Sequence, residues 1–291
     1  MAEDNQTISV DTNIYQAGSG GYLNDWQSET SSIGSLISRG LMENGRRYQT
    51  LSKKGYLMPS DEQMFDSYEA GHLVALVLES DKANPLFRSP IGDRPAHILD
   101  LGTGKGNWAI DVADMYPETT VRGVDLFPPP VTWMPPNCVF EVDNALEEWT
   151  WQQPFDLVHM RIMIGSFDPS EWNKLYKRIY DNLRPGGWIE QLEACPCIDS
   201  DDESIPADSI LRSWFPNMKA CGTAAGRDVM ILDTMADSIR AAGFVEVHEK
   251  PYKWPIGAWA RDRRFKEAGM INFQHWMGGM EGWSMWLLTL D

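Results

Sequence analysis

The stretch Ile98-Leu-Asp-Leu-Gly-Thr-Gly-Lys-Gly106 decides the fold, because an apolar run of strand type passes directly into a glycine-rich turn. A helical pattern over residues 106–115 follows at once. Glycines let the backbone approach a ligand closely, and a helix N-terminus favours negative groups of that ligand. The spacing of Gly102, Gly104 and Gly106 departs by one residue from the G-x-G-x-x-G fingerprint, so the spacing alone leaves a ligand-binding loop and a structural turn open.

Downstream of this turn, strand patterns and helical patterns alternate. The strand patterns lie at 97–101, 120–125, 138–142, 155–159 and 188–192, and the helical ones at 106–115 and 170–183. This alternation predicts an α/β fold with a Rossmann-like, doubly wound, mostly parallel sheet. Residues 203–242 are helical again, and residues 244–249 predict one further strand.

Polar residues stand at the ends of these predicted strands. Asp125 ends the second strand, where a carboxylate can accept both hydroxyls of a ribose. Asp143 and Asn144 follow the third strand, where they can meet an adenine edge. Each also has a structural interpretation, as a strand-end acid or a polar turn. The turn Arg184-Pro-Gly-Gly187 adds a fourth loop, and loops at the carboxyl edge of a parallel sheet converge on one crevice.

The N-terminal third differs in pattern from the sheet region. Residues 1–30 are rich in Gly, Ser, Thr, Asn and Asp and predict a flexible tail. Residues 31–95 predict a helical lead-in, with one helical stretch that reaches Leu41 and another that begins at an Asp61 cap. Residues 96–291 would then form the main domain.

Bulk properties exclude several classes of function. The formal net charge is −17, which disfavours nucleic acid as a partner. The N-terminus lacks a signal-peptide pattern and no run of about 18 apolar residues occurs, so we expect a cytoplasmic protein that does not enter a membrane. The only close cysteine pair, Cys195 and Cys197, is a weak zinc signal, so we expect reduced thiols and no metal site.

Five segments in order resemble the motifs of class I methyltransferases. They are Leu99-Asp-Leu-Gly-Thr-Gly-Lys-Gly-Asn-Trp-Ala-Ile-Asp111, Gly123-Val-Asp-Leu126, Phe140-Glu-Val-Asp143, Phe155-Asp-Leu-Val-His-Met-Arg161 and Leu183-Arg-Pro-Gly-Gly-Trp-Ile-Glu190. The chain is most similar to the fungal LaeA-like group, whose members also resemble it at Glu43-Asn-Gly-Arg-Arg-Tyr48, Tyr56-Leu-Met-Pro-Ser-Asp-Glu-Gln63, Pro255-Ile-Gly-Ala-Trp259 and Gly279-Met-Glu-Gly-Trp-Ser284. The resemblance covers residues 40–290 and implies S-adenosylmethionine as the cofactor.

The resemblance also implies a set of cofactor contacts. Gly102, Thr103 and Gly104 would wrap the methionine part, Asp125 the ribose, and Asp143 with Asn144 the adenine. Tyr48 and Arg47 of the lead-in would close over the methionine end, where an arginine can pair with the carboxylate, although an ordinary exposed helix face explains them nearly as well. The remaining expected contacts are Asp100, Asn107, Leu126, Ala145 and His159.

Methyl transfer requires mainly that acceptor and methyl group are held in line and that water is excluded. If the acceptor must lose a proton, His159 at the end of the fourth strand is the first candidate base and His72 on the lead-in the second. Both histidines also have a purely structural interpretation.

Acceptor-binding insertions are expected at about 195–235 and 254–290. The second of these contains Trp254, Trp259, His275, Trp276 and Trp283. This aromatic content predicts a small, fairly apolar acceptor, as in secondary metabolism, but the residues do not indicate whether oxygen, nitrogen or carbon is methylated.

One feature departs from the family pattern. Class I methyltransferases usually finish the sheet with an antiparallel strand beyond the Gly279–Ser284 region, whereas this chain stops at Asp291. Either Trp283–Leu290 supplies that strand, or the sequence is shortened, or a second copy completes the edge as a homodimer.

Two other functions compete with the enzyme. LaeA-like proteins are linked to control of secondary metabolism through regulatory protein partners, which would also allow a nuclear location. A NAD-dependent oxidoreductase would share the first two strands, but Asp143 and the Arg184–Gly187 turn argue against it.

Overall fold

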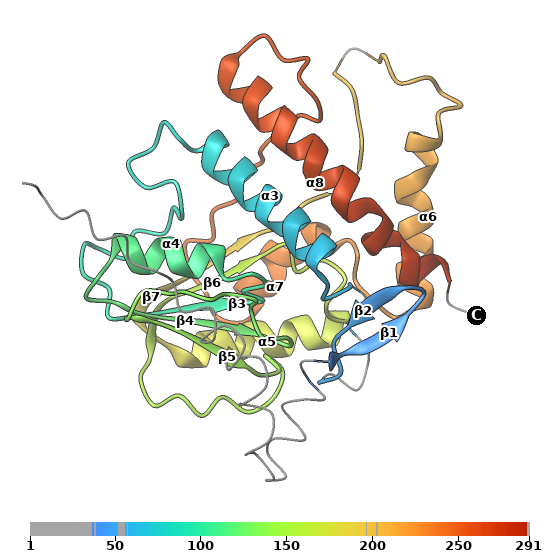
Figure 1. Cartoon of the computed structure of the whole chain (residues 1–291). Coiled ribbons are helices and arrows are strands. Elements are labelled where there is room, and N and C mark those ends of the chain that lie inside the picture. The colour runs from blue at the N-terminus through green and yellow to red at the C-terminus, as the bar shows by residue number, and fades with distance from the viewer. Residues whose placement is uncertain are drawn as a thin grey trace, which may run out of the picture. The chain divides into compact units, whose positions relative to one another are not determined.

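Five parallel strands form the central sheet of the protein (Figure 1). They are β3 (His97–Leu101), β4 (Thr120–Asp125), β5 (Cys138–Val142), β6 (Phe155–Arg161) and β7 (Leu183–Leu192). Their order across the sheet is β5-β4-β3-β6-β7, and every neighbouring pair is parallel. The order reverses between β3 and β6, which confirms the predicted doubly wound sheet and marks a topological switch point, where such sheets bind ligands. The computed structural model describes residues 37, 39–51, 56, 58–195, 197–201 and 203–289.

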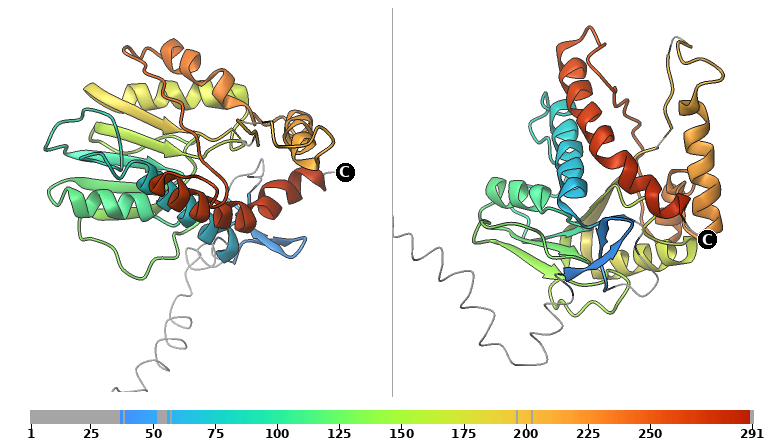
Figure 2. Two further views of the ribbon diagram at one scale, coloured as in Figure 1. Left: turned by 90° about the horizontal axis from the view of Figure 1, so that it is seen from above. Right: turned by 45° about the vertical axis from the view of Figure 1, so that its right-hand side comes forward.

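Alternate residues of the strands point to opposite faces of the sheet and pack into two separate hydrophobic cores. Ile98, Val121 and Leu157 face α4 (Asn107–Met115), which buries Trp108 and Val112 against them. Residues on the opposite face of the strands pack against α5 (Pro169–Asn182) and α7 (Met235–Ala241); these strand residues are Leu99, Leu101, Val124, Val158 and Met160. The helices α4 and α5 therefore cover opposite faces of the sheet (Figure 2).

Two helices far apart in the sequence, α3 (Glu62–Leu78) and α8 (Arg263–Leu288), lie side by side in Figures 1 and 2. Asp61 caps α3 by accepting from the backbone N–H of Met64, as the sequence predicted. Buried His275 of α8 bonds to Ser67 of α3. This pair of helices sits on the α4 side, because His72 of α3 contacts Asp111 of α4.

The prediction that the first helical stretch reaches Leu41 is wrong at its end, because residues 41–48 form an antiparallel hairpin of β1 (Leu41–Glu43) and β2 (Arg46–Tyr48). Residues 37 and 39 are helical, and the rest of that stretch before Gly40 lies outside the described residues. The two turn residues, Asn44 and Gly45, have φ angles of 49° and 78°. This left-handed pair is the geometry that an Asn-Gly turn prefers between two strands. The lead-in therefore contains a hairpin and a helix.

The strand predicted at 244–249 is absent, and so is the strand that Trp283–Leu290 would supply in one of the three alternatives for the last strand. Among the described residues, 244–249 pair with no strand, although Phe244 and Val247 still pack against the core. Trp283 belongs to α8, so the described part of 283–290 is helical and does not complete the sheet. The turn Arg184–Gly187 lies inside β7, at a shift in its register with β6.

The remaining chain contains α6 (Ile210–Ala224) and a short 3-10 helix, η1 (Ile231–Asp233). The described residues from Gly40 onward belong to one compact unit, and the predicted tail at 1–30 lies outside the described residues. Cys195 and Cys197 form a disulfide, so the expectation of reduced thiols is wrong for this pair. Within the described ranges, no cluster of three or more His, Cys, Asp or Glu side chains could hold a metal ion, and no helix is long and apolar enough to span a bilayer.

Candidate functional site

A cavity of about 460 Å³ opens at the carboxyl ends of β3, β4 and β6. This volume falls in the range of about 300 to 1,000 Å³ that is typical of small-molecule sites. The glycine turn after β3 forms one wall, and α3 and α4 contribute His72 and Trp108. The position is the one that the strand order predicts for a ligand site.

The backbone of the glycine turn is shaped by two left-handed residues, Gly102 with φ 69° and Gly104 with φ 56°. The N–H groups of Gly102 and Thr103 both donate to the carbonyl of Val124, at 2.8 and 3.0 Å, which ties the turn to β4. A Cβ atom on Gly102 would lie 2.2 Å from the Met163 sulfur, whereas at Gly104 the nearest atom is 4.0 Å away. Gly102 is thus required for packing, and Gly104 leaves space open.

Asp125 ends β4 beside this turn. One of its oxygens accepts from the N–H of Gly104 at 2.8 Å, and the other accepts from that of Phe127 at 3.3 Å. Burial raises the pKa of Asp125 to about 6, although these backbone donors act in the opposite direction. The carboxyl group lines the cavity and can accept further hydrogen bonds there.

The end of the cavity near β5 is lined by a polar turn of residues 143–147. The Asp143 carboxylate accepts from the N–H of Asn144 at 2.7 Å, and the Asn144 side chain accepts from the N–H of Leu146 at 3.1 Å. Arg178 of α5 donates to the carbonyls of Ala145 and Glu147. These bonds fix the backbone of the turn at the cavity wall.

His159 and Asp100 form a buried pair at the cavity floor, each about 3% exposed. The Nδ1 atom of His159 lies 2.7 Å from one Asp100 oxygen, and the Thr103 hydroxyl donates to the other at 2.7 Å. The imidazole stacks on Trp108, with ring centroids 3.7 Å apart and planes 5° from parallel. Because the carboxylate accepts from Nδ1–H, the Nε2 atom carries the lone pair in the neutral form of the ring, and no described residue is its partner.

His72 belongs to a second polar chain, which joins α3, α4 and β6. Its Nε2 lies 2.8 Å from Asp111, and the Arg161 guanidinium lies 2.9 Å from its Nδ1. Burial lowers the pKa of His72, and the charge of Arg161 lowers it further against the effect of Asp111. Both ring nitrogens are occupied, so this histidine has no free atom to receive a proton from a ligand.

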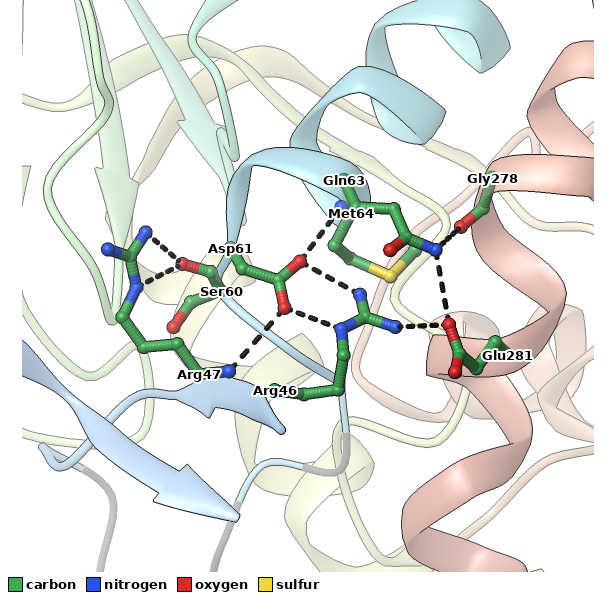
Figure 3. A network of polar contacts seen from close by, with 8 residues as sticks. All are labelled: Arg46, Arg47, Ser60, Asp61, Gln63, Met64, Gly278 and Glu281. Atoms are coloured by element: carbon green, nitrogen blue, oxygen red, sulfur yellow. Dashed lines mark hydrogen bonds and ion pairs between the residues drawn. The ribbon is translucent and has the colours of Figure 1, made fainter. Parts of the chain in front are cut away.

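A separate network, here called the hairpin clamp, joins the hairpin to α3 and α8 through Arg46, Asp61, Gln63 and Glu281 (Figure 3). Arg46 donates to both Asp61 oxygens, at 2.6 and 2.8 Å, and to Glu281 at 3.4 Å. Gln63 donates to Glu281 at 3.3 Å. Burial opposes ionisation of Asp61, but Arg46 and the Met64 N–H outweigh it and lower the pKa of this carboxyl.

The predicted contacts Arg47 and Tyr48 belong to the edge of this clamp and lie outside the cavity lining. Arg47 donates to the Ser60 carbonyl at 2.9 and 2.7 Å, and its guanidinium lies 4.7 Å from the centre of the Phe127 ring. Tyr48 is only 4% exposed. The hairpin turns both residues toward the protein instead of presenting them on a helix face.

All other predicted site residues are brought together at the cavity. They are His72, Asp100, Gly102, Thr103, Gly104, Asn107, Asp125, Leu126, Asp143, Asn144, Ala145 and His159. Sequence reasoning missed Tyr56, Tyr68, Arg161 and Met163, which also line it. The sequence signal for Arg161 was its position at a strand end, two residues after His159. Of the expected acceptor insertions at 195–235 and 254–290, the described residues contribute Arg227 alone.

Comparison with known families agrees with this geometry. A family model described as a methyltransferase domain matches residues 71–249. The match spans β3 to β7 and therefore includes the glycine turn, Asp125, Asp143 and His159.

Three curated relatives cover most of this chain. The methyltransferase pytC of Aspergillus terreus is 32% identical over 91% of this chain and 81% of its own length. The secondary metabolism regulator laeA of Aspergillus fumigatus is 36% identical over 76% of this chain and 58% of its own. The protein-methionine methyltransferase laeA of Emericella nidulans is 34% identical over the same shares. The chain therefore spans less than two thirds of both laeA proteins.

Solved structures resemble the chain more distantly. The crystal structure of human N-acetylserotonin methyltransferase with S-adenosylmethionine has 15% identity and a TM-score of 0.40, over 66% of this chain and 56% of that chain. PigF with S-adenosylhomocysteine has 17% identity and a TM-score of 0.43, over 64% and 54%. The fold assignment rests on the strand order and register given above.

Proposed function

The chain belongs to the methyltransferase domain family, and on this premise we propose that it transfers a methyl group from S-adenosylmethionine to a small, fairly apolar acceptor. The observation that carries the proposal is that the glycine turn, Asp125, the Asp143 turn and His159 all line the same cavity. The Nε2 atom of His159 has no partner among the described residues. Binding groups for an adenosine and a candidate proton acceptor thus line the same cavity.

The cavity residues fit this cofactor in chemistry and in position. Asp125 at the end of β4 offers carboxylate oxygens to ribose hydroxyls, and the neighbouring 143–145 turn at the end of β5 offers backbone and side-chain groups to adenine. The open left-handed turn at Gly104 allows close approach of a ligand to the backbone. When bound, S-adenosylmethionine supplies an electrophilic methyl group on a sulfonium.

The protein's own contribution would be positioning and removal of one acceptor proton. Asp100 holds the His159 imidazole in the tautomer that leaves Nε2 unprotonated, and Trp108 fixes the plane of the ring. Nε2 would accept the proton that a hydroxyl, acid or amine loses on methylation. His72 has no free nitrogen, so His159 is the better supported of the two predicted bases.

The wall beyond β6 supports an apolar acceptor. Ile162, Met163 and Phe167 line this part of the cavity. Water is excluded more readily from such a wall, which favours displacement at the methyl group over side reactions. The methylated atom of the acceptor is not specified by these residues.

The cofactor part of the proposal is tested by calorimetric titration with S-adenosylmethionine and with NAD. We expect micromolar affinity for the first and none for the second. Asp125→Asn should weaken binding at least about 10-fold, because the amide keeps only one acceptor oxygen and removes the negative charge that strengthens hydrogen bonds from the ribose hydroxyls. Asp237→Asn, on an exposed side chain of α7, is the matched control and should bind as the wild type does. Absence of binding by the wild type would refute the proposal.

The role of His159 is tested with His159→Gln, which keeps a polar side chain but no base. For an acceptor found by screening apolar metabolites, we expect the turnover rate to fall about 100-fold and its dependence on pH to flatten, while cofactor affinity stays within about 2-fold. Equal turnover in variant and wild type would show that no base is used.

A second candidate function follows from the laeA relatives. Two of them are named as a secondary metabolism regulator and a protein-methionine methyltransferase, so this chain would bind the cofactor and act on or through a protein partner. Under this proposal the protein acts in the nucleus, whereas the small-molecule enzyme is cytoplasmic. Incubation of a cell extract with methyl-labelled cofactor separates the two, because label enters either protein or small metabolites. Sedimentation at several concentrations would test the proposed homodimer.

A further inference from the structure

Arg161 differs from the other cations of the cavity. It stands at the last position of β6, beside β3 in the sheet, and lines the cavity while mostly buried. The Nδ1 atom of His72 is its hydrogen-bond partner at 2.9 Å, and none of the described carboxylates lies within ion-pair distance of its guanidinium. The charges of Asp100 and Asp111 act on the guanidinium only from beyond that distance. A buried guanidinium without a directly bonded carboxylate is costly, so such a group is expected to meet one from a ligand.

The neighbouring cations are already engaged. Lys105 pairs with Asp66 and Glu69, and Arg227 donates to the Ser166 carbonyl and lies 3.7 Å from Glu171. Arg178 is used by the carbonyls of the 145–147 turn. Lys174 also lines the cavity, but its side chain is exposed to water. Arg161 is therefore the buried cation that the described cavity residues leave without a carboxylate.

The surroundings hold Arg161 in place without forming a direct ion pair with it. His72 Nδ1 must accept from the guanidinium, so its Nε2–H donates to Asp111 of α4. The bond to His72 of α3 fixes one Nη group of Arg161. The remaining N–H groups of the planar guanidinium can then donate to a ligand in the cavity. A fixed guanidinium loses little conformational entropy when it binds a planar anion.

The order of the strand ends indicates which anion it meets. The groups suited to adenine lie at β5, the ribose acid Asp125 at β4 and the glycine turn at β3. The next strand along this edge is β6. A cofactor bound along this edge, with its adenine at β5, would therefore place its opposite end beside the last residue of β6. In S-adenosylmethionine that end carries an amino group and a carboxylate.

We propose that Arg161, held by His72 and Asp111, binds the carboxylate at the methionine end of the cofactor. The inference rests on the proposed cofactor. It assigns to Arg161 the pairing that the sequence had suggested for Arg47, which instead donates to the Ser60 carbonyl. It also makes His72 a positioning residue that acts through Arg161. An acceptor carboxylate is the other source of the same chemistry.

The test compares two ligands that differ at this end. S-adenosylhomocysteine carries the amino and carboxylate groups, and 5′-methylthioadenosine lacks both. By calorimetric titration, Arg161→Met should weaken binding of the first about 10- to 100-fold and leave the second within about 2-fold. Arg161→Lys, which keeps the charge but loses the fork, should fall between Arg161→Met and the wild type.

Two further variants separate a local effect from general damage. Arg178→Met acts at the adenine end and should weaken both ligands alike. His72→Gln should weaken S-adenosylhomocysteine by a smaller factor than Arg161→Met and leave 5′-methylthioadenosine unchanged, because the arginine keeps its charge and loses its support. Urea unfolding of each variant reports whether the fold is intact.

The outcomes distinguish the inference from the function on which it rests. If the wild type binds neither ligand, the proposed function fails. If the wild type binds both and Arg161→Met changes neither, or weakens both equally, the carboxylate assignment is overturned. If Arg161→Met leaves both unchanged but abolishes binding of phenylacetate to the S-adenosylhomocysteine complex, the site belongs to an acceptor carboxylate and the cofactor assignment is overturned.

Discussion

The cavity edge of the sheet and the hairpin clamp are both built from partly or wholly buried charged side chains, but they use their hydrogen-bonding atoms differently. In the clamp, Arg46 donates to Asp61 and Glu281, so its charge is paired within the protein. At the cavity, His159 keeps Nε2 free and Arg161 has no carboxylate partner among the described residues. A polar network that is satisfied within the protein stabilises the fold, whereas one with unsatisfied groups can bind a ligand.

The largest effect is expected from breaking the clamp at Asp61. Asp61→Asn keeps the helix cap but leaves the buried Arg46 guanidinium without its main counter-charge, which should lower the free energy of unfolding by about 3 kcal/mol. Urea denaturation measures this loss. Cofactor affinity of the folded variant should be unchanged.

A second variant sharpens the same point. Adding Arg46→Met to Asp61→Asn removes the unpaired charge and should restore part of the lost stability. If the double variant is less stable than Asp61→Asn, the loss does not come from an uncompensated buried charge.

The next effect concerns the glycine turn. Gly102→Ala would place a Cβ atom against Met163 and should reduce affinity for S-adenosylhomocysteine about 100-fold. Gly186→Ala is the matched control, because Gly186 also has a positive φ, of 80°, but its Cβ would meet nothing within 4 Å. It should cost about 1 kcal/mol of stability and no affinity. Equal affinity in both variants would contradict the proposed role of the turn.

A pH effect is expected from Glu193, which follows β7 and accepts from the N–H groups of Met163 and Ile164. Burial raises its pKa from 4.5 to about 7, against these donors. Between these values the folded protein holds a proton on Glu193 that the unfolded chain has lost, so the contribution of Glu193 to the free energy of unfolding should fall as the pH rises from about 4.5 to about 7, by about 1 to 3 kcal/mol.

Glu193→Gln removes this titration and should flatten the profile measured by urea unfolding at several pH values. Asp125, with its pKa raised to about 6, has the same sign and leaves a smaller slope in the variant. Glu203→Gln, on an exposed side chain, is the control and should retain the slope of the wild type. The buried histidines His72 and His275, whose pKa values are lowered, contribute with the opposite sign but equally in wild type and variant. A difference in unfolding free energy between the wild type and Glu193→Gln that does not fall over this range would contradict the assignment.

The smallest effect is expected at the outer end of the clamp. Glu281 is 53% exposed and lies 3.4 Å from Arg46, so Glu281→Gln should change stability by less than about 0.5 kcal/mol. A loss as large as that of Asp61→Asn would show that the exposed end of the clamp contributes as much as the buried end.

Local pattern alone located most of the fold. Apolar runs of strand type, alternating with helical patterns, placed the five sheet strands, and the Asp61 cap placed the start of α3. The hairpin was missed because the apolar residues before Leu41 suggested a helix, although Asn44-Gly45 is a strong hairpin signal. The strand expected at 244–249 did not form, because strand propensity acts only where a neighbouring strand supplies hydrogen bonds.

The sequence by itself determined the sheet, the glycine turn and the acids that follow the strands, because each depends on residues close together in the chain. Tertiary structure alone decided that Arg47 lies outside the cavity lining and that Arg161 belongs to it. It also decided that His72 is occupied while His159 keeps a free nitrogen. These outcomes depend on contacts among α3, α4 and β6, and no local sequence pattern specifies which distant side chain will satisfy a buried polar atom.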